Sequence, residues 1–196
     1  RIAFEEMGLG PTAIICAILH DVVEDTEYTL KDITKGFNPK VVRIVDGLTK
    51  LDGLYNVESL QAENFKKVLS TLVEDVRVIL IKMCDRIHNL RTIGSMPRHK
   101  QLKIAAETSY IYIPLAHRLG LYKIKTEFQD LCLKINEPDV YSNLTQKISE
   151  SATDRKEYIE AFIKPMTAKL DELHIPYRTQ SRIKAISSIY NKIKTK

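Results

Sequence analysis

The sequence has little glycine and little proline, seven of each in 196 residues. Average proteins use roughly 7% glycine and 5% proline, and turn-dense all-β folds need many of both. The shortage therefore argues against a β-sandwich and favours long, uninterrupted helices. Long hydrophobic runs are also missing, since stretches such as Val76–Ile81 fall far short of the roughly 20 apolar residues that cross a bilayer. With no recognisable signal peptide, the sequence predicts a globular chain without a membrane partner.

Cysteine is scarce and odd in number. Cys16, Cys84 and Cys132 lie far apart, each in apolar helical sequence, and no metal-ligand spacing joins them. Such cysteines are usually small buried hydrophobic residues, so we expect three free thiols. This usage favours the reducing cytoplasm.

The charge is only mildly unbalanced, with 30 basic and 25 acidic residues and a net charge of +5. The basic residues form no block or stripe, and a nucleic-acid groove needs one. We therefore predict no direct nucleic-acid site in this chain. A polyphosphate ligand and an ordinary solvated surface both remain open as explanations of the excess.

Helical signals dominate the first 173 residues. Pro11 opens an apolar helix, Thr29 with Asp32 suits a capped short helix, and Asn38 caps the next helix. Gly47 and Gly53 predict a break in that helix, followed by a flexible loop over 51–56. Further helices are expected over 58–72, 75–92, 100–118 and 121–135, from Pro138 onward, and over 154–173; the segment 75–92 is apolar nearly all round and could also be a buried strand.

The pattern changes near the C-terminus. Residues 175–179 predict a first β-strand and residues 186–194 a helix. The expected class is therefore mainly α: an all-helical bundle over 1–135, a helical connector over 136–173, and the beginning of an α/β domain over 174–196. The uncapped start at Arg1 and the abrupt end at Lys196 predict that both ends are cuts in a longer protein.

The most informative run is HDVVEDT, residues 20–26. On a continuous helix, His20 would share a face with Glu24, and Asp21 with Asp25. Three carboxylates and an imidazole so placed repel one another unless a cation neutralises them. An acidic helix end with solvated carboxylates is the alternative, although acidic residues prefer the first turn of a helix rather than its far end.

A second polar stripe lies in the segment 75–92. Asp85, Asn89 and Thr92 are spaced to share one face of an otherwise apolar helix. A buried aspartate needs a partner. Either Arg86 or His88 could satisfy Asp85, or Asp85 could complete a metal site with His20 and Asp21. A mixed histidine and carboxylate set suits Mn²⁺, Fe²⁺ or Zn²⁺ better than Ca²⁺.

These residues resemble a known family. An adjacent His-Asp pair followed by a distant Asp is the signature of HD-domain metallophosphohydrolases. Five longer strings resemble the RelA/SpoT family of bifunctional alarmone enzymes over almost the whole chain: HDVVEDT (20–26), VDGLTKL (45–51), LQAEN (60–64), DRIHNLRT (85–92) and PLAHRLG (114–120).

The resemblance implies both a fold and an activity. Family members use an HD domain to remove the 3′-pyrophosphate of (p)ppGpp with Mn²⁺, giving GDP or GTP and pyrophosphate in the stringent response. By position, His20, Asp21 and Asp85 match the metal ligands. Glu24 and Asp25 match the acidic pair that positions or activates the attacking water, and Asn89 and Thr92 match positions that line the nucleotide pocket.

The resemblance also implies parts that are missing here. The family's metal site has another histidine upstream of the His-Asp pair, and residues 1–19 contain none. The basic residues that hold the guanine base also lie upstream in the family. Both would precede Arg1, so this stretch alone is expected to be impaired in hydrolysis.

Residues 181–190 (SRIKAISSIY) resemble the first ATP-phosphate loop of the family's synthetase domain, which makes (p)ppGpp from ATP and GDP or GTP. The family often has Gly and His where this chain has Ser181 and Ala185. Arg182 and Lys184 are therefore candidate ATP-phosphate contacts, with a solvated basic turn as the alternative. The synthetase's acidic metal ligands would follow Lys196.

Three other functions stay open at this point. The chain could be a catalytically silent nucleotide-binding regulatory module, the remnant of an enzyme used mainly as a (p)ppGpp synthetase (a GTP pyrophosphokinase), or a helical scaffold without a ligand. His117 and Arg118 are interpreted as members of a helix-ending motif before Gly120 rather than as catalytic residues.

Overall fold

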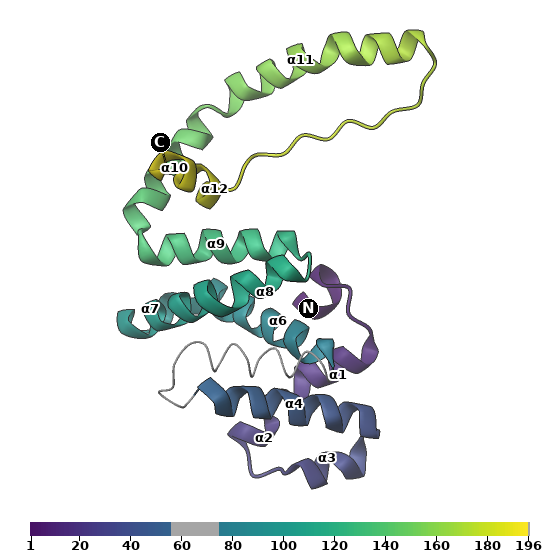
Figure 1. Ribbon diagram of the computed structural model, residues 1–196, viewed down its shortest axis with the longest axis vertical. Coiled ribbons are helices and arrows are strands. Elements are labelled where there is room, and N and C mark those ends of the chain that lie inside the picture. Colours follow the sequence, from purple (N-terminus) through teal and green to yellow (C-terminus); the bar gives the residue numbers. More distant parts are fainter. Residues whose placement is uncertain (56–74, 196) are drawn as a thin grey trace. The chain divides into compact units, whose positions relative to one another are not determined.

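The computed structural model describes the backbone of residues 1–55 and 75–195, and the side chains of 1–50 and 75–195 (Figure 1). The predicted helix over 58–72, the LQAEN motif and Asn56 lie outside the described residues. The chain divides into two compact units, Arg1–Phe128 and Gln129–Lys196. No strand occurs among the described residues, which confirms the mainly α class.

The first unit is built from short and medium helices. They are η1 (Ile2–Glu6), α1 (Pro11–Leu19), α2 (Val22–Asp25), α3 (Leu30–Gly36), α4 (Pro39–Tyr55), α6 (Val76–Thr92), η2 (Ile93–Ser95), α7 (Arg98–Glu107), η3 (Thr108–Tyr112), α8 (Ile113–Arg118) and the first half of α9 (Tyr122–Asn136).

Local capping sets several helix starts, and the caps on α3 and α4 are the predicted ones. Thr29 and Asp32 form a reciprocal capping box on α3. The side chain of Asn38 accepts from the backbone N–H of Lys40 and Val41, each at 3.1 Å, and so caps α4. Asp75 accepts from the backbone N–H of Arg77 at the start of α6.

Helices α1, α4 and α6 pack against one another around the core of this unit. Buried residues come from all three, and α6 contributes eight of them. The apolar segment 75–92 is therefore a helix, because its side chains meet neighbouring helices over most of its circumference. The buried members in α4 and α6 include Ile44, Val45, Leu48, Ile79, Ile81, Met83 and Ile87.

The predicted break at Gly47 and loop from residue 51 are wrong, since α4 continues to Tyr55. Gly47 is buried within α4 and faces Val78 of α6. A Cβ atom at position 47 would lie 2.9 Å from Val78 Cγ2, closer than ordinary van der Waals contact. The glycine therefore allows two helices to approach closely, and it does not end one of them.

The single helix predicted over 100–118 is also wrong in detail. A π-helical turn, η3, separates α7 from α8. Pro114 in the first turn of α8 has no backbone N–H to donate to the carbonyl four residues earlier, and this gap interrupts the α-helical ladder. At the first residue of η3, the hydroxyl of Thr108 donates to the carbonyl of Ile104 at 2.7 Å.

Helix α8 ends as the sequence predicts. Gly120 has a φ of 72°, in the left-handed region. Its N–H donates to the carbonyl of His117, and the N–H of Leu121 donates to the carbonyl of Ala116 at 2.8 Å. This is the Schellman pattern, so His117 takes part in the end of the helix.

The second unit contains the end of α9, α10 (Pro138–Glu150), α11 (Ala152–Glu172) and α12 (Ile186–Lys194), with α10 packed against both α11 and α12. The predicted helix over 186–194 is confirmed, but the predicted strand over 175–179 is wrong. These residues are extended without ladder pairing, because a strand exists only beside a hydrogen-bonded neighbour and no described segment supplies one.

Two features of the side chains complete the fold. All three cysteines are free and buried, as predicted.

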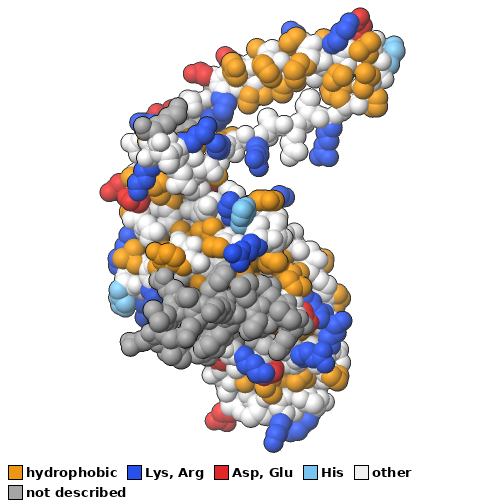
Figure 2. Space-filling model, viewed as in Figure 1, with side chains coloured by type: hydrophobic (Ala, Val, Ile, Leu, Met, Phe, Trp, Pro, Cys, Tyr) orange, Lys and Arg blue, Asp and Glu red, His pale blue; other side chains and the backbone are white. Residues whose placement is uncertain are grey.

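Along α11, apolar side chains stay exposed, visible as orange atoms in Figure 2; they include Tyr158, Phe162 and Met166. Among the described helices, none combines the length and apolar character needed to span a bilayer.

The close approach of α4 and α6 gives a stability prediction. Gly47→Ala is expected to lower the free energy of unfolding by about 1–2 kcal/mol, because overpacking costs about 1–3 kcal/mol and the better helix propensity of alanine returns up to about 1 kcal/mol. Adding Val78→Ala removes the clashing methyl groups, so the double variant should lose less than the sum of the two single variants. Urea denaturation measures both effects.

The matched control is Gly36→Ala, because nothing lies within 4 Å of the Cβ position at this residue of α3. It should be neutral or slightly stabilising. Equal stability of Gly47→Ala and the unmodified chain would show that Val78 does not limit the approach of the two helices.

Candidate metal and nucleotide site

The HDVVEDT run does not form one continuous helix. Helix α1 ends at Leu19, His20 and Asp21 form a turn, and α2 begins at Val22. The prediction that His20 stacks on Glu24 along one helix is therefore wrong. Glu24 and Asp25 instead lie in α2, a single turn of four residues that ends at Asp25.

His20 is held by contacts at both ring nitrogens. Nδ1 lies 2.9 Å from the carbonyl oxygen of Ala17. Nε2 lies 2.9 Å from Asp21 Oδ2 and 3.6 Å from Asp85 Oδ1. The turn after α1 and the middle of α6 therefore bring together the three residues that the sequence proposes as metal ligands.

The electrostatics of this trio are strongly coupled. The carboxylate of Asp85, with a smaller contribution from Asp21, raises the pKa of His20 despite partial burial. By distance the hydrogen-bond partner of Nε2 is Asp21, but the Asp85 side chain is less exposed, 26% against 48%, so its charge is less screened. With acceptors at both ring nitrogens, the imidazolium form is favoured in the metal-free protein.

The two carboxylates respond in opposite directions. Burial raises the pKa of Asp21, and the charge of His20 only partly offsets it. Burial also acts to raise the pKa of Asp85, but the interactions with His20 and Lys82 outweigh it and leave that pKa lowered. Asp85 is therefore the more firmly ionised carboxylate of the pair.

Asp85 is also oriented by its own helix. The amide nitrogen of Asn89 lies 3.1 Å from Oδ1 and 3.2 Å from Oδ2 of Asp85. Arg86, one of the alternative partners considered for Asp85, pairs with Glu107 at 3.2 Å and lies over the Tyr112 ring. Asn89 thus acts on the carboxylate in the way that outer-shell residues orient metal ligands.

Sequence reasoning missed one charged residue beside the trio. Lys82 is only 5% exposed and lies three residues before Asp85 on α6. Its charge contributes to the lowered pKa of Asp85 and opposes the effect of burial that raises the pKa of Asp21. The available signal was a lysine within an apolar helix, one turn from a candidate ligand.

A cavity of about 350 Å³ opens beside the trio. His20, Asp85 and His88 form one part of its wall, and Arg1, Ile2 and Ala3 of the η1 region form another. The contribution of η1 was not predicted, because nothing in its sequence indicates proximity to a segment about 85 residues away. The cavity is large enough for part of a small polar ligand.

The donor chemistry of the trio fits a divalent cation. The bond from Nδ1 to a backbone carbonyl presents Nε2 outward, which is the usual arrangement of a histidine ligand. In the part of the chain that the structure describes, however, no three His, Cys, Asp or Glu side chains are already arranged around a metal position. His20 Nε2 instead faces the two carboxylates, 2.9 Å from Asp21 Oδ2 and 3.6 Å from Asp85 Oδ1, so a cation would displace the Nε2 proton.

The remaining predicted site residues are placed as follows. Glu24 and Asp25 are exposed on α2. The charge of Asp25 is close enough to Asp21 to contribute to the raised pKa of Asp21. The hydroxyl of Thr92 donates to the carbonyl of His88 at the end of α6. Arg182 and Lys184 are exposed in the extended segment that precedes α12, in the second unit.

The all-helical first unit and the His-Asp turn facing a distant aspartate define the class of the protein. The model of the HD domain family matches residues 3–122. The chain belongs to the HD domain family.

Longer relatives extend this result. The chain is 42% identical over 193 residues to a guanosine-3′,5′-bis(diphosphate) 3′-pyrophosphohydrolase of Vibrio cholerae, a match that covers 97% of this chain and 27% of that protein. It is 42% identical over 190 residues to the bifunctional (p)ppGpp synthase/hydrolase SpoT of Escherichia coli, with 96% and 27% covered. A GTP pyrophosphokinase of Streptomyces coelicolor is 40% identical over 188 residues, with 96% and 22% covered.

These matches confirm the resemblance to the RelA/SpoT family read from the five motifs. The chain spans about a quarter of the length of the curated relatives it matches.

The contacts of His20 give a prediction that needs no metal. In the chelator-treated protein, NMR titration should place the pKa of His20 above its ordinary value of about 6.5, and Asp85→Asn should lower it. Because the folded pKa is raised, the interaction stabilises the fold most below about pH 6.5 and is lost as the pH rises through the folded value.

The control is Asp154→Asn, which removes a carboxylate at the start of α11 in the other unit and should leave the titration of His20 unchanged. If Asp85→Asn also left it unchanged, the coupling of α1 to α6 through these two side chains would be refuted.

Proposed function

We propose that this chain carries the site of a metal-dependent (p)ppGpp 3′-pyrophosphohydrolase of the stringent response. The observation that carries the proposal is the approach of Asp21 and Asp85 to one histidine nitrogen, within a chain 42% identical to proteins named for this reaction. The products would be GDP or GTP and pyrophosphate.

We propose Mn²⁺ as the cofactor, held by His20, Asp21 and Asp85. HD hydrolases are metal-dependent, and an imidazole with two carboxylates suits this ion. When bound, the cation would neutralise phosphate charge and lower the pKa of a water molecule. The cavity beside the trio supplies room for the phosphate groups next to these ligands.

The other site residues receive roles by their positions. Glu24 and Asp25 would orient the attacking water and accept its proton, since a nearby carboxylate can act as a general base. Asn89 would hold Asp85 in place. The family resemblance assigns Asn89 and Thr92 to the nucleotide pocket, although neither lines the cavity beside the trio. The water oxygen bonds to the phosphorus on the 3′ oxygen, the bond between that phosphorus and the 3′ oxygen breaks, and the 3′ oxygen takes a proton.

The second unit fits a different part of the proposal. We propose that residues 136–173 form a connector and residues 174–196 begin a synthetase domain that uses ATP and GDP or GTP. Arg182 and Lys184 are exposed, as contacts to ATP phosphates require. The free cysteines support a cytoplasmic location.

A second candidate is an enzyme used mainly for (p)ppGpp synthesis, with a silent hydrolase site. The GTP pyrophosphokinase relative favours it, since it matches this chain at 40% identity. The intact His-Asp pair and its contact with Asp85 favour hydrolysis instead.

The test compares pyrophosphate release from ppGpp by the full gene product with and without Mn²⁺. We expect release that depends on Mn²⁺ and falls by more than about 100-fold in Asp85→Ala, because even outer-shell partners of a metal ligand are worth about 10–100-fold. Asp154→Ala serves as the matched control and should keep full activity.

Calorimetric titration with Mn²⁺ separates the outcomes. Weaker Mn²⁺ binding by Asp85→Ala supports the ligand assignment even where turnover is slow. Tight ppGpp binding without turnover at saturating Mn²⁺ would replace the hydrolase with the silent module, and unchanged hydrolysis in Asp85→Ala would refute the metal site.

A further inference from the structure

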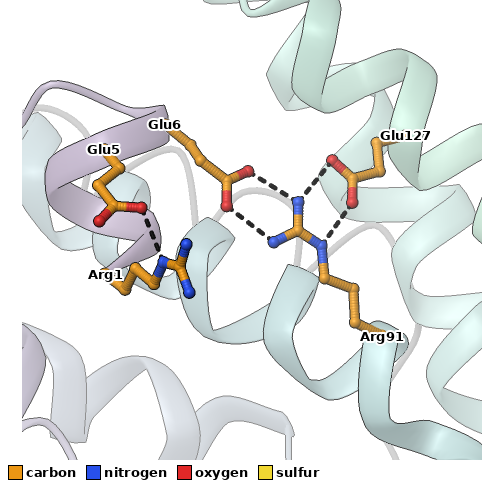
Figure 3. Close-up of polar contacts among 5 residues, drawn as sticks. All are labelled: Arg1, Glu5, Glu6, Arg91 and Glu127. Carbon is orange, nitrogen blue, oxygen red and sulfur yellow. Dashed lines mark hydrogen bonds and ion pairs between the residues drawn. The ribbon is translucent and has the colours of Figure 1, made fainter.

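Arg91 forms an ion-pair arrangement that joins three elements of the first unit (Figure 3). Its Nη1 and Nη2 donate to the two carboxylate oxygens of Glu6 at 2.8 and 2.7 Å. Its Nε and Nη2 donate to the two oxygens of Glu127 at 2.6 and 3.0 Å. One guanidinium therefore binds two carboxylates, each through two hydrogen bonds.

The three residues come from distant parts of the chain. Glu6 ends η1, Arg91 lies near the end of α6, and Glu127 lies in α9. Paired hydrogen bonds of this kind fix direction as well as distance. The hydrogen bond from Arg91 is the main cause of the lowered pKa of Glu6, so both partners stay charged near neutral pH.

The η1 turn needs contacts with the rest of the fold, and it packs against α1 and α6. It has only five residues, far fewer than an isolated helix needs for stability in water. Its other ion pair, Arg1 with Glu5, is exposed and lies within the same turn (Figure 3), so it cannot hold η1 to the rest of the fold. Ala3 is the one buried residue of η1.

The position of η1 matters because it forms a wall of the candidate site. Ile2 and Ala3 line the same cavity as His20 and Asp85. Arg91 itself is not among the lining residues, and its Nε, Nη1 and Nη2 are all engaged by carboxylates. In this arrangement Arg91 acts on the cavity through Glu6 and does not bind a ligand directly.

We propose that Arg91 is a positioning residue that, by clamping Glu6, holds η1 as the wall of the nucleotide cavity. Glu127 completes the clamp by fixing the guanidinium from the side of α9. This inference rests on the proposed function only for the identity of the ligand. The closing of the cavity by the clamp is a property of the protein itself and can be measured without substrate.

Cys84 is a built-in probe of that wall. It lines the cavity and is 6% exposed, and burial raises the pKa of its thiol to about 11. Release of η1 should expose the thiol to an alkylating reagent. Cys16 and Cys132 are also buried, so peptide mass spectrometry can use them as internal references within the same sample.

The decisive comparison is Glu6→Gln against Glu5→Gln in the chain without metal or nucleotide. Glu6→Gln breaks the clamp, whereas Glu5→Gln breaks only the exposed pair within η1. We expect the alkylation rate of Cys84 to rise about fivefold in Glu6→Gln, which corresponds to the loss of about 1 kcal/mol of interaction, and to stay unchanged in Glu5→Gln.

Arg91→Met separates opening from electrostatics. The charge of Glu6 also raises the pKa of Cys84, so removing that charge alone would speed alkylation. Arg91→Met breaks the same clamp but keeps Glu6 and removes a positive charge. Faster alkylation of Cys84 in both Glu6→Gln and Arg91→Met therefore reports release of η1 from the cavity. Arg91→Lys should recover only part of the protection of Cys84, because lysine cannot form the paired hydrogen bonds.

Hydrolysis by the full gene product then tests the link to function. We expect Glu6→Gln to raise KM for ppGpp about fivefold or more, the effect of about 1 kcal/mol on ground-state binding, with kcat nearly unchanged. Equal Cys84 rates in Glu6→Gln and Glu5→Gln would overturn the clamp. Faster alkylation with an unchanged KM would overturn its role toward the nucleotide, and absence of hydrolysis in the unmodified protein would instead refute the proposed function.

Discussion

The burial of α6 is the constraint on which the first unit depends. This helix packs against α1, α4 and η1, and eight of its 17 residues are buried. A helix so enclosed can carry a charged residue only where partners meet it. Asp85 and Lys82 are tolerated because they lie on one side of α6, where His20 and Asp21 supply opposite and compensating charges. The candidate site is therefore a place where a half-buried aspartate and a buried lysine of this helix are compensated by neighbouring charges.

The turn at His20 and Asp21 follows from that arrangement. If α1 continued without interruption, His20 and Glu24 would lie on one stripe and Asp21 would not be free to approach Nε2 from the turn. Ending α1 at Leu19 lets the carbonyl of Ala17 fix one side of the imidazole while both carboxylates approach the other. The same turn separates Glu24 and Asp25 from α1 and places them in the short helix α2.

The parts that sequence predicted correctly are those set by neighbours within a few residues. The caps at Thr29 and Asn38 and the end of α8 at Gly120 need only local hydrogen bonds. The prediction of a helix break at Gly47 is wrong because the glycine is required by its close contact with Val78, a residue on another helix. The strand over 175–179 was misread because strand formation requires a partner that a single segment cannot reveal.

The candidate site likewise combines features set by local sequence with features set by distant residues. Its donors could be predicted from the motif strings, since the residue types and their spacing limit the chemistry. The surroundings of these donors could not be predicted, because the position of η1 depends on the ion pairs of Arg91 with Glu6 and Glu127. These partners lie 85 and 36 positions away from Arg91 in the sequence. A donor set without a wall would bind a cation but would not orient a nucleotide, because orientation requires a surface fixed relative to the ligands. The long-range ion pairs are thus what would convert a local motif into a site with a defined shape.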